Sequence, residues 1–336
     1  MKLPADKFAR LRGFYQGRRV LVTGGAGFIG GHLCDALVSL GAVTTVIDDL
    51  SNSSLEHLAG LIEMEPEKVR FVHGSILDDE AVADAADDAQ TIFHLAALGS
   101  VPRSIDYPQR TWSVNATGTL RILEAAKIHA VERVVLTSSS SVYGDDPSLP
   151  RVETQMPRPL SPYAASKLAA ESLNSVWARC YALSTVSLRF FNVFGPRQNA
   201  NSAYAAVIAA FARRLLSGEA PVIYGDGSQT RDFTYVDDAV LGALLAGASR
   251  NPLAGDTLNI GTGRSTSIAR LADLMIERSE IGGVRPSLEP ARKGDVAHSL
   301  ADWSRAKDLI AFEPSTSLEA GLDETIKWYR ATLARA

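Results

Sequence analysis

Short apolar runs, many of them rich in β-branched residues, alternate with longer stretches rich in alanine and leucine through the first two-thirds of the chain. The short runs predict six strands, at residues 18–24, 43–48, 69–74, 91–97, 133–138 and 185–191. The longer stretches predict helices, among them residues 30–40, 78–88, 115–129 and 163–182. Apolar strands separated by helices indicate a parallel sheet covered on both faces. The predicted fold class is therefore α/β, with a doubly wound parallel sheet.

This alternation loosens after about residue 192, where Gly, Pro and Asn cluster in FGPRQNANS and again in YGDGSQTRD. We therefore expect a main domain over residues 18–191 and a smaller C-terminal lobe over residues 192–336. Some segments of that lobe, such as the apolar run TLNIG, are expected to return to the main domain. Residues 1–17 are expected to form a short surface helix ahead of the fold.

A glycine-rich turn joins the first predicted strand to the helix after it. Gly24, Gly27 and Gly30 have the spacing GxxGxxG. Glycine allows positive φ in a tight turn and lets a pyrophosphate approach the backbone. The following helix directs its free N–H groups and partial positive charge at that phosphate. The strand–turn–helix context predicts a Rossmann-type dinucleotide site.

An acidic pair ends the second predicted strand and indicates which dinucleotide binds. Asp48 lies eighteen residues beyond Gly30. A carboxylate there can accept hydrogen bonds from both ribose hydroxyls of the adenosine half. Asp49 adds a second negative charge, and no arginine follows nearby, so a 2′-phosphate would be repelled. We therefore expect NAD rather than NADP as the cofactor.

Two further segments carry candidate chemistry. In SPYAASK, Pro162 suits the first turn of a helix, and Tyr163 and Lys167 then share one helix face. An ammonium beside a tyrosine favours the phenolate, so we expect a lowered tyrosine pKa. In TSSSSVYG, the serine run 138–141 follows an apolar strand, at the end of the sheet where ligands bind in α/β folds.

Composition and charge narrow the class of protein without naming a substrate. Hydrophobic residues make up 46% of the 336 residues, and the net charge is −4, so neither a nucleic-acid nor a membrane partner is favoured. Cys34 and Cys180 are far apart, which fits reduced thiols in a cytoplasmic protein. The N-terminus lacks the apolar core of a signal peptide. No metal site is expected.

With these motifs in this order, nearly the whole chain resembles the extended short-chain dehydrogenase/reductase superfamily, in particular its nucleotide-sugar-modifying members. The resemblance rests on GGAGFIG, the strand-end serines and YAASK. It extends through LRFFNVFGPRQ, YGDGSQTRDFTYVDD and GDVAHSLAD. It implies a catalytic set of Ser139, Tyr163 and Lys167, with Tyr163 taking the proton of a sugar 4-hydroxyl and Ser139 hydrogen-bonding that oxygen.

The resemblance also implies binding residues. Those expected to bind NAD, besides Tyr163 and Lys167, are Gly24, Gly27, Phe28, Ile29, Gly30, Asp48, Ser75, Ile76, Leu95, Ala96, Ala97 and Asn115. Those expected to bind a UDP-sugar, besides Ser139 and Tyr163, are Ser100, Arg103, Ser140, Ser141, Phe191, Asn192, Ala206, Val207, Tyr224, Arg231, Arg292, Asp295 and Ser299. The arginines suit a diphosphate, because their forked donors fit phosphate oxygens. Ser75 departs from the family, which usually has an acidic residue there, and this makes the adenine contact less secure.

Within this family the serine run bears on the reaction. By this resemblance, the 4,6-dehydratases and the glucuronate decarboxylases of the family carry an acidic residue directly before Val-Tyr-Gly, and dehydration needs an acid to protonate the leaving hydroxyl. Ser141 stands there instead. The resemblance therefore favours a UDP-sugar 4-epimerase. A small residue at Ser299, where related enzymes restricted to UDP-glucose and UDP-galactose have tyrosine, implies that UDP-GlcNAc and UDP-GalNAc are accepted.

Several alternatives stay open at this point. A UDP-glucuronate 4-epimerase can share the serine run, although Asn192 argues mildly against it, because that group tends to have threonine there. A dehydratase or decarboxylase would share the 4-keto intermediate. A non-catalytic NAD-sensing scaffold would have no need of Ser139, Tyr163 and Lys167 together. The resemblance also implies a homodimer, formed through the helices near residues 115–129 and 163–182.

Overall fold

The computed structural model describes residues 5–200, 206–281, 283–291 and 296–334. Its centre is a seven-stranded parallel sheet in the order β11-β6-β5-β4-β1-β2-β3, so the predicted α/β, doubly wound fold class is confirmed. The strands of this sheet are β1 (Arg19–Thr23), β2 (Val43–Asp48), β3 (Val69–His73), β4 (Thr91–His94), β5 (Arg133–Ser139), β6 (Ser184–Phe190) and β11 (Ala254–Ile260).

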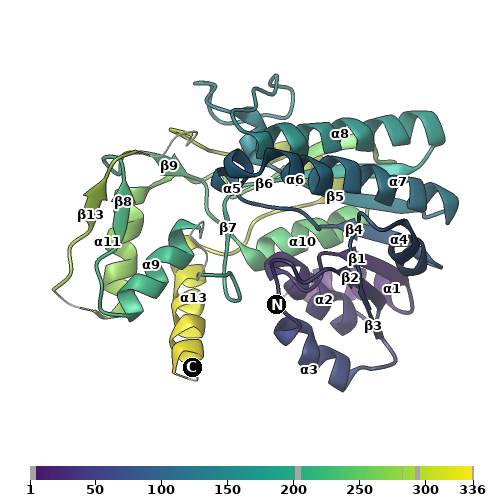
Figure 1. Cartoon of the computed structure of the whole chain (residues 1–336), viewed down its shortest axis with the longest axis horizontal. Coiled ribbons are helices and arrows are strands. Elements are labelled where there is room, and N and C mark those ends of the chain that lie inside the picture. The colour runs from purple at the N-terminus through teal and green to yellow at the C-terminus, as the bar shows by residue number, and fades with distance from the viewer. Residues whose placement is uncertain (1–4, 201–205, 282, 292–295, 335–336) are drawn as a thin grey trace.

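Helices cover both faces of the sheet (Figure 1). On one face, α1 (Ala5–Tyr15), α2 (Phe28–Ser39), α10 (Val236–Gly247) and α12 (Ser304–Ile310) share a core with the strands. On the other face lie α4 (Asp79–Ala86), α7 (Gly118–Ile128) and α8 (Pro162–Tyr181). The N-terminal helix is anchored rather than loosely attached, because Leu11 and Tyr15 are fully buried and the Tyr15 hydroxyl donates to Leu244 O at 2.8 Å.

Shorter elements connect these layers. They are α3 (Glu56–Met64), α5 (Val101–Asp106), α6 (Pro108–Trp112), the π-helical turn η1 (Ser113–Thr117) and the 3₁₀ turn η2 (Ser140–Tyr143). The π-turn directly precedes α7, where the sequence predicts one continuous helix from residue 115. The strand predicted over residues 91–97 ends at His94, because Leu95 and the residues after it leave the sheet.

A smaller lobe lies to one side of the sheet (Figure 1). Its separate core joins α9 (Val207–Leu216), α11 (Ile268–Ser279) and α13 (Leu318–Leu333). Three two-stranded ribbons complete this region, and they pair β7 (Val193–Phe194) with β10 (Thr234–Tyr235), β9 (Thr230–Arg231) with β12 (Thr266–Ser267), and β8 (Val222–Tyr224) with β13 (Ser287–Glu289). The lobe faces the carboxyl ends of the central strands. No described helix has the length and apolar character needed to span a bilayer.

Candidate active site

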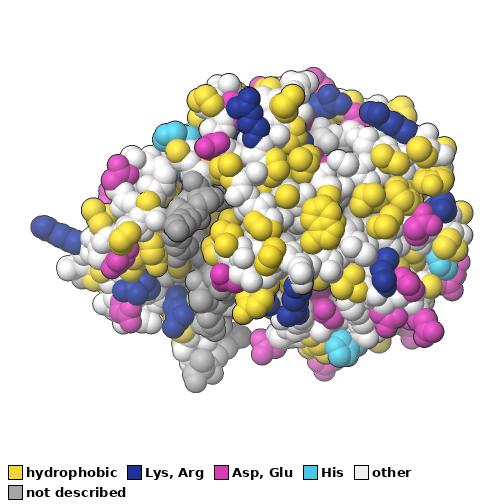
Figure 2. Space-filling model, turned by 45° about the horizontal axis from the view of Figure 1, so that its top comes forward, with side chains coloured by type: hydrophobic (Ala, Val, Ile, Leu, Met, Phe, Trp, Pro, Cys, Tyr) yellow, Lys and Arg dark blue, Asp and Glu magenta, His cyan; other side chains and the backbone are white. Residues whose placement is uncertain are grey.

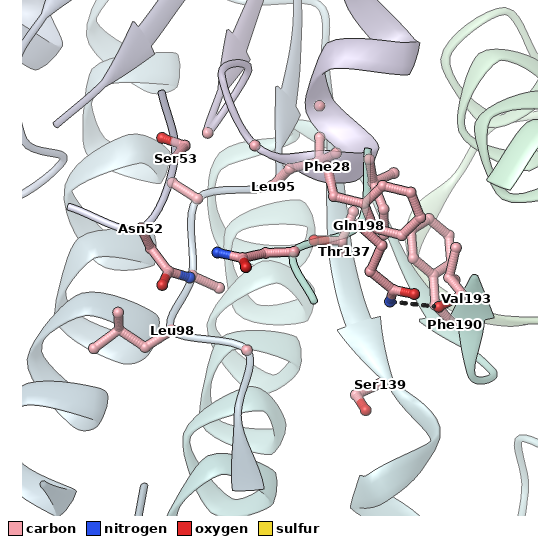
Figure 3. A pocket seen from close by; sticks show the side chains of 18 of the residues that line it. Phe28, Asn52, Ser53, Leu95, Leu98, Thr137, Ser139, Phe190, Val193 and Gln198 are labelled. Carbon is pink, nitrogen blue, oxygen red and sulfur yellow. Dashed lines mark hydrogen bonds between the residues drawn. The ribbon is translucent and has the colours of Figure 1, made fainter. Parts of the chain in front are cut away.

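One large cavity of about 1150 Å³ opens at the carboxyl ends of the central strands and runs toward the smaller lobe. Its walls come from the turns after β1, β2 and β4, from the end of β5, from the start of α8 and from the segment after β6. Figure 3 shows Asn52 and Ser53 on one side of it and Phe190 and Gln198 on the other. Because the strand order reverses direction between β1 and β4, the cavity lies at the topological switch point, where α/β sheets bind ligands.

The glycine turn forms one end of the cavity and fits the pyrophosphate of a dinucleotide. Gly24 has φ of +71°, and a Cβ there would lie 2.7 Å from Ala96 N. A Cβ on Gly30 would lie 2.2 Å from Gly24 O. Gly27 is the N-cap of α2, whose twelve residues begin at Phe28, so the free N–H groups of that helix face the turn. The positions of Gly24 and Gly30 therefore both require glycine, because neighbouring backbone approaches too closely for a Cβ and gives the turn its tight shape.

Asp48 ends β2 inside the cavity, as the sequence predicts. Its Oδ2 accepts a hydrogen bond from Ala26 N at 3.0 Å, and its Oδ1 accepts from Leu50 N and Ser53 Oγ at 2.9 Å each. These bonds use about three of the four lone-pair positions of a carboxylate. The carboxylate is thus fixed in place inside the cavity, with acceptor capacity left for a ribose hydroxyl.

The residues expected around the rest of the dinucleotide also line the cavity. Phe28, Ile29, Ser75 and Ile76 do so, and so does the segment 95–97, which leaves the sheet after β4. The Ser75 hydroxyl accepts a hydrogen bond from Leu77 N at 3.2 Å. The Ser75 side chain therefore stabilises the turn after β3, and Ser75 also lines the cavity.

Asn115 lies behind the cavity wall rather than in it. Its Oδ1 accepts from Leu98 N at 2.8 Å, and its Nδ2 donates to Leu98 O and to Ser166 Oγ at 3.3 and 3.0 Å. Ser166 Oγ in turn donates to Tyr163 O. Asn115 thereby ties the segment after β4 to the start of α8. Its place in this structure indicates a positioning role rather than contact with the cofactor.

His94 extends this buried network to the glycine turn. The Thr119 hydroxyl donates to Asn115 O at 2.6 Å, so it accepts from His94 Nε2, 3.0 Å away. His94 Nδ1 is then the acceptor for the Thr23 hydroxyl at 2.7 Å, and Thr23 Oγ1 accepts from Ala96 N. Burial lowers the pKa of His94 to about 3, so the ring stays neutral. A single tautomer of His94, in β4, therefore bonds to Thr23 of β1 and, through Thr119, to the π-turn at Asn115. These contacts lie behind the cofactor end of the cavity.

The candidate catalytic residues meet where β5 and α8 approach each other. Ser139 ends β5, and its Oγ accepts from Ser141 N at 3.2 Å. The side chain of Ser161 caps α8, and Pro162 occupies the first turn, which confirms the expected helix start. Tyr163 and Lys167 follow on one face of that helix and line the cavity together with Ser139.

The electrostatics of this set differ from the expectation at one point. Burial raises the pKa of Tyr163, and only the hydrogen-bonding interaction with Ser139 lowers it, so the expected net lowering by the lysine is wrong for this structure. Burial also lowers the pKa of Lys167 to about 8, with Glu171 acting in the opposite direction. The Lys167 Nζ donates to Thr137 O at 2.8 Å, which holds it against the end of β5.

The expected substrate residues divide into three groups. Those that line the cavity are Ser140, Ser141, Asn192, Arg231 and Ser299. Those that the structure describes elsewhere are Ser100, Arg103, Phe191, Ala206, Val207 and Tyr224. Arg292 and Asp295 lie outside the described residues. The described cavity therefore brings together the sugar-proximal serines and one of the two expected diphosphate arginines.

Three residues of the second group have identifiable local roles. The Ser100 side chain accepts from Arg103 N at 3.3 Å and so caps α5. The Arg103 guanidinium donates to Asn52 Oδ1 at 3.3 Å, at the loop after β2. Phe191 is fully buried and packs against Tyr143 with ring centroids 6.2 Å apart. Their side chains support the walls of the site in this structure.

Sequence reasoning missed several lining residues. They are Thr137, Arg151, Leu160, Phe190, Arg197, Gln198, Arg213, His298 and the loop residues 50–54. Thr137 and Phe190 could have been found, because each lies within two residues of an expected site residue at a strand end. The Gln198 amide donates to Val193 O at 3.1 Å, which is drawn as a dashed line in Figure 3. Arg151 and Arg213 carry no sequence signal, because only tertiary folding brings them to the cavity.

These features define an α/β dinucleotide-binding protein with a Ser–Tyr–Lys set at its switch point. Residues 20–261 match the model of the NAD dependent epimerase/dehydratase family. A UDP-glucose 4-epimerase from Mycolicibacterium smegmatis is 38% identical over 315 residues, covering 93% of this chain and 98% of that protein. The chain therefore belongs to the NAD dependent epimerase/dehydratase family, which confirms both the resemblance and NAD as the cofactor.

Solved structures agree with this membership. A UDP-N-acetylglucosamine 4-epimerase from Methanobrevibacter ruminantium, in complex with UDP-N-acetylmuramic acid, superposes with a TM-score of 0.89 at 38% identity, covering 94% of this chain and 99% of that one. A UDP-glucose 4-epimerase from Thermotoga maritima, with UDP-glucose, gives 0.88 at 38% identity and the same coverage. Equal identity to enzymes named for different sugars means that overall similarity does not select the sugar.

Proposed function

We propose that this protein is a UDP-sugar 4-epimerase that interconverts UDP-GlcNAc and UDP-GalNAc and also accepts UDP-glucose and UDP-galactose. The observation that carries the proposal is the distribution of acids in the cavity. Among its described lining residues, the carboxylates are Asp48, Asp49 and Glu56, all near the dinucleotide end. Ser139, Ser140 and Ser141 line the other end, so a 4-keto sugar there meets no described general acid that could expel a 6-hydroxyl.

The proposed mechanism assigns one role to each catalytic residue. Tyr163 takes the proton of the sugar 4-hydroxyl, and Ser139, which interacts with the Tyr163 phenol, hydrogen-bonds the same oxygen and relays the proton. Lys167, held at Thr137 O, supplies a positive charge that stabilises the phenolate of Tyr163, the form that accepts the proton and becomes the phenol. NAD, when bound, supplies the acceptor that takes a hydride from C4 and returns it. Rotation of the 4-keto sugar before the proton and hydride return gives the 4-epimer.

The NAD would be held by the residues already placed at the dinucleotide end. The Gly24–Gly30 turn and the start of α2 would receive the pyrophosphate, and Asp48 the adenosine ribose. Ser75 and Ile76 would flank the adenine, and the segment 95–97 the nicotinamide half. Arg231, which is largely buried, would face the UDP diphosphate, together with Arg292 by family resemblance.

The mass of the product distinguishes the proposed epimerase from the lyases of this family. Purified protein is incubated with UDP-GlcNAc, UDP-glucose and UDP-glucuronate in separate reactions, and the products are analysed by NMR, which identifies the 4-epimer, and by mass spectrometry. An epimerase keeps the substrate mass, whereas dehydration or decarboxylation lowers it. A product of lower mass would replace the proposal with a dehydratase or decarboxylase, and epimerisation confined to UDP-glucuronate would replace it with the other epimerase.

Ser299→Tyr tests the proposed acceptance of N-acetylated sugars. Ser299 lines the cavity and is only 8% exposed, so a tyrosine ring there would take space inside the cavity. We expect kcat/KM for UDP-GlcNAc to fall at least about a hundredfold while turnover of UDP-glucose stays within about threefold. Steady-state kinetics with both sugars measure this, with Ser299→Ala as the small-residue control. Equal loss of both activities would contradict the proposal that residue 299 determines whether the N-acetyl group is accepted.

We also propose a homodimer. The face that carries α5, α6 and α8 exposes large apolar side chains, namely Ile105, Tyr107, Trp112, Val176 and Tyr181. In Figure 2, where the top of Figure 1 is turned toward the viewer, hydrophobic side chains gather across the middle and right of the visible face. Contiguous apolar surface of this kind marks an interface more often than free surface. Sedimentation velocity should give about twice the monomer mass of 35.9 kDa, and a monomer at micromolar concentration would contradict the proposal.

A further inference from the structure

A buried ion pair lies directly behind the serine run and has no role in the mechanism above. The guanidinium of Arg189, in β6, donates to Glu171 of α8 through Nε at 2.9 Å and a terminal nitrogen at 2.7 Å. Arg189 is 3% exposed and Glu171 is 6% exposed. The second terminal nitrogen of Arg189 is also buried, and it has no hydrogen-bond partner among the described residues.

Stability alone is a poor explanation for this pair. Removing two charges from water costs several kcal/mol per ion, and well-packed apolar residues are often as stable as a buried pair. An incompletely satisfied guanidinium adds to that cost. Glu171 also has a contact besides Arg189, and it connects the pair to the serine run.

Glu171 holds the residue that precedes the candidate catalytic serine. The Ser138 hydroxyl donates to Glu171 Oε1 at 2.5 Å. Ser138 is the last residue but one of β5, and Ser139 ends that strand at the cavity. Because the strand end is held at Ser138, the neighbouring Ser139 is fixed in its position relative to α8.

Arg189 continues the same network toward the turn that follows Ser139. Its guanidinium lies 4.6 Å from the ring centroid of Tyr143, which ends the 3₁₀ turn. The Tyr143 hydroxyl donates to Asn259 Oδ1 at 2.7 Å, in β11. The pair therefore joins β5, α8, β6 and the serine turn, which are the elements that carry the proposed sugar end of the site.

Glu171 is also linked to Lys167 along α8. Tyr163, Lys167 and Glu171 follow one another at four-residue spacing, which places them on one face of the helix. Burial lowers the pKa of Lys167 to about 8, and the negative charge of Glu171 opposes that change. Glu171 is thus the described carboxylate that favours the charged form of this lysine.

The other titratable groups around Lys167 cannot replace Glu171. His94, from β4, is neutral because burial lowers its pKa to about 3. Tyr163 offers no lasting negative charge, because burial raises its pKa in this structure and the phenolate that acts as base becomes neutral once it takes the sugar proton. Arg189 is positive and hydrogen-bonds the carboxylate of Glu171. The end of β5 offers only the neutral carbonyl of Thr137.

We propose that Glu171, held by Arg189, is a positioning residue for the reaction: it fixes Ser138, and with it Ser139, and it keeps the Lys167 ammonium charged. This inference deepens the proposed function and rests on it for its kinetic consequence. The effect of Glu171 on the charge of Lys167 can be measured by NMR without enzymatic turnover. The chain contains only eight lysines, so the resonance of Lys167 can be followed by itself.

The first test is an NMR titration of the NAD-bound protein with ¹³C-labelled lysine side chains. The Lys167 resonance is assigned as the one missing from Lys167→Arg. In Glu171→Gln we expect its midpoint to move to lower pH by about one unit, because an opposite charge has been removed. Glu65→Gln, which removes an exposed partner of Lys68, should leave the Lys167 midpoint in place. An unchanged midpoint in Glu171→Gln would overturn the electrostatic part of the inference.

The second test is the pH dependence of kcat with UDP-GlcNAc. The alkaline limb, on which Lys167 loses its proton, should move to lower pH in Glu171→Gln by the same amount. Ser138→Ala keeps both charges, so it should lower kcat about tenfold without moving the limb. A purely structural role would lower kcat equally at every pH and leave the limb in place. If Ser138→Ala keeps wild-type kcat, Glu171 does not act through the strand end.

Glu171→Gln leaves Arg189 buried without its partner and can fail to fold. The neutral double variant Glu171→Gln/Arg189→Gln removes both charges and should show the same shift of the Lys167 midpoint. A wild-type protein that epimerises no UDP-sugar would refute the proposed function, while the NMR midpoint would still test the effect of Glu171 on Lys167.

Discussion

Replacing Tyr163 by phenylalanine should lower kcat for UDP-GlcNAc epimerisation by a factor on the order of 10³ while leaving NAD binding close to that of the wild type. The substitution removes one hydroxyl. That hydroxyl lies in the cavity, interacts with Ser139 and is the proposed acceptor of the proton from the sugar. The backbone N–H of residue 163 still donates to Ser104 Oγ, so the start of α8 should be unchanged.

Steady-state kinetics and calorimetric titration with NAD measure the two effects separately. Tyr181→Phe, at the exposed end of the same helix, is the matched control and should keep wild-type kcat. Retention of more than about a tenth of kcat in Tyr163→Phe would show that another group takes the proton.

The second large effect is expected from Gly30→Ala. A Cβ at this position would lie 2.2 Å from Gly24 O and 2.8 Å from Gly25 Cα, and both atoms belong to the backbone and cannot rotate away. The glycine turn must therefore shift out of the position that would bind the pyrophosphate. Overpacking of this kind costs about 3 kcal/mol, which corresponds to roughly hundredfold weaker NAD binding.

Gly60→Ala is the matched control for this prediction. A Cβ on Gly60, within α3, has no neighbour within 4 Å, so NAD affinity should be unchanged and the helix slightly stabilised. Titration of NAD into protein stripped of cofactor measures the affinities, and thermal unfolding reports stability. Wild-type NAD affinity in Gly30→Ala would contradict the assignment of the turn.

The local motifs predicted which residues of the proposed dinucleotide end meet in one cavity, because these motifs depend on short-range geometry. A strand, a glycine turn and a helix are contiguous in sequence, and an acid that ends the next strand must lie at the same edge of the sheet. The same reasoning placed Ser139, Tyr163 and Lys167 in one cavity. Residue spacing was sufficient at these positions.

Side-chain direction and burial could not be predicted in the same way. Asn115 and Phe191 lie close in sequence to lining residues, but their side chains are buried in the walls. The direction of the Tyr163 pKa shift was wrong because desolvation outweighs the favourable interaction, and desolvation is a property of the packed structure. The ion pair of Glu171 and Arg189 joins residues eighteen apart on different elements, so no local pattern indicates it.

The central claim is that this protein oxidises and re-reduces C4 of a UDP-sugar within one active site. The most direct measurement uses UDP-GlcNAc carrying deuterium at C4, with product analysis by NMR and mass spectrometry. We predict UDP-GalNAc that retains the deuterium at C4, because the hydrogen removed from the sugar returns to the same carbon. Loss of the deuterium, or a lighter product without a 4-epimer, would contradict this account.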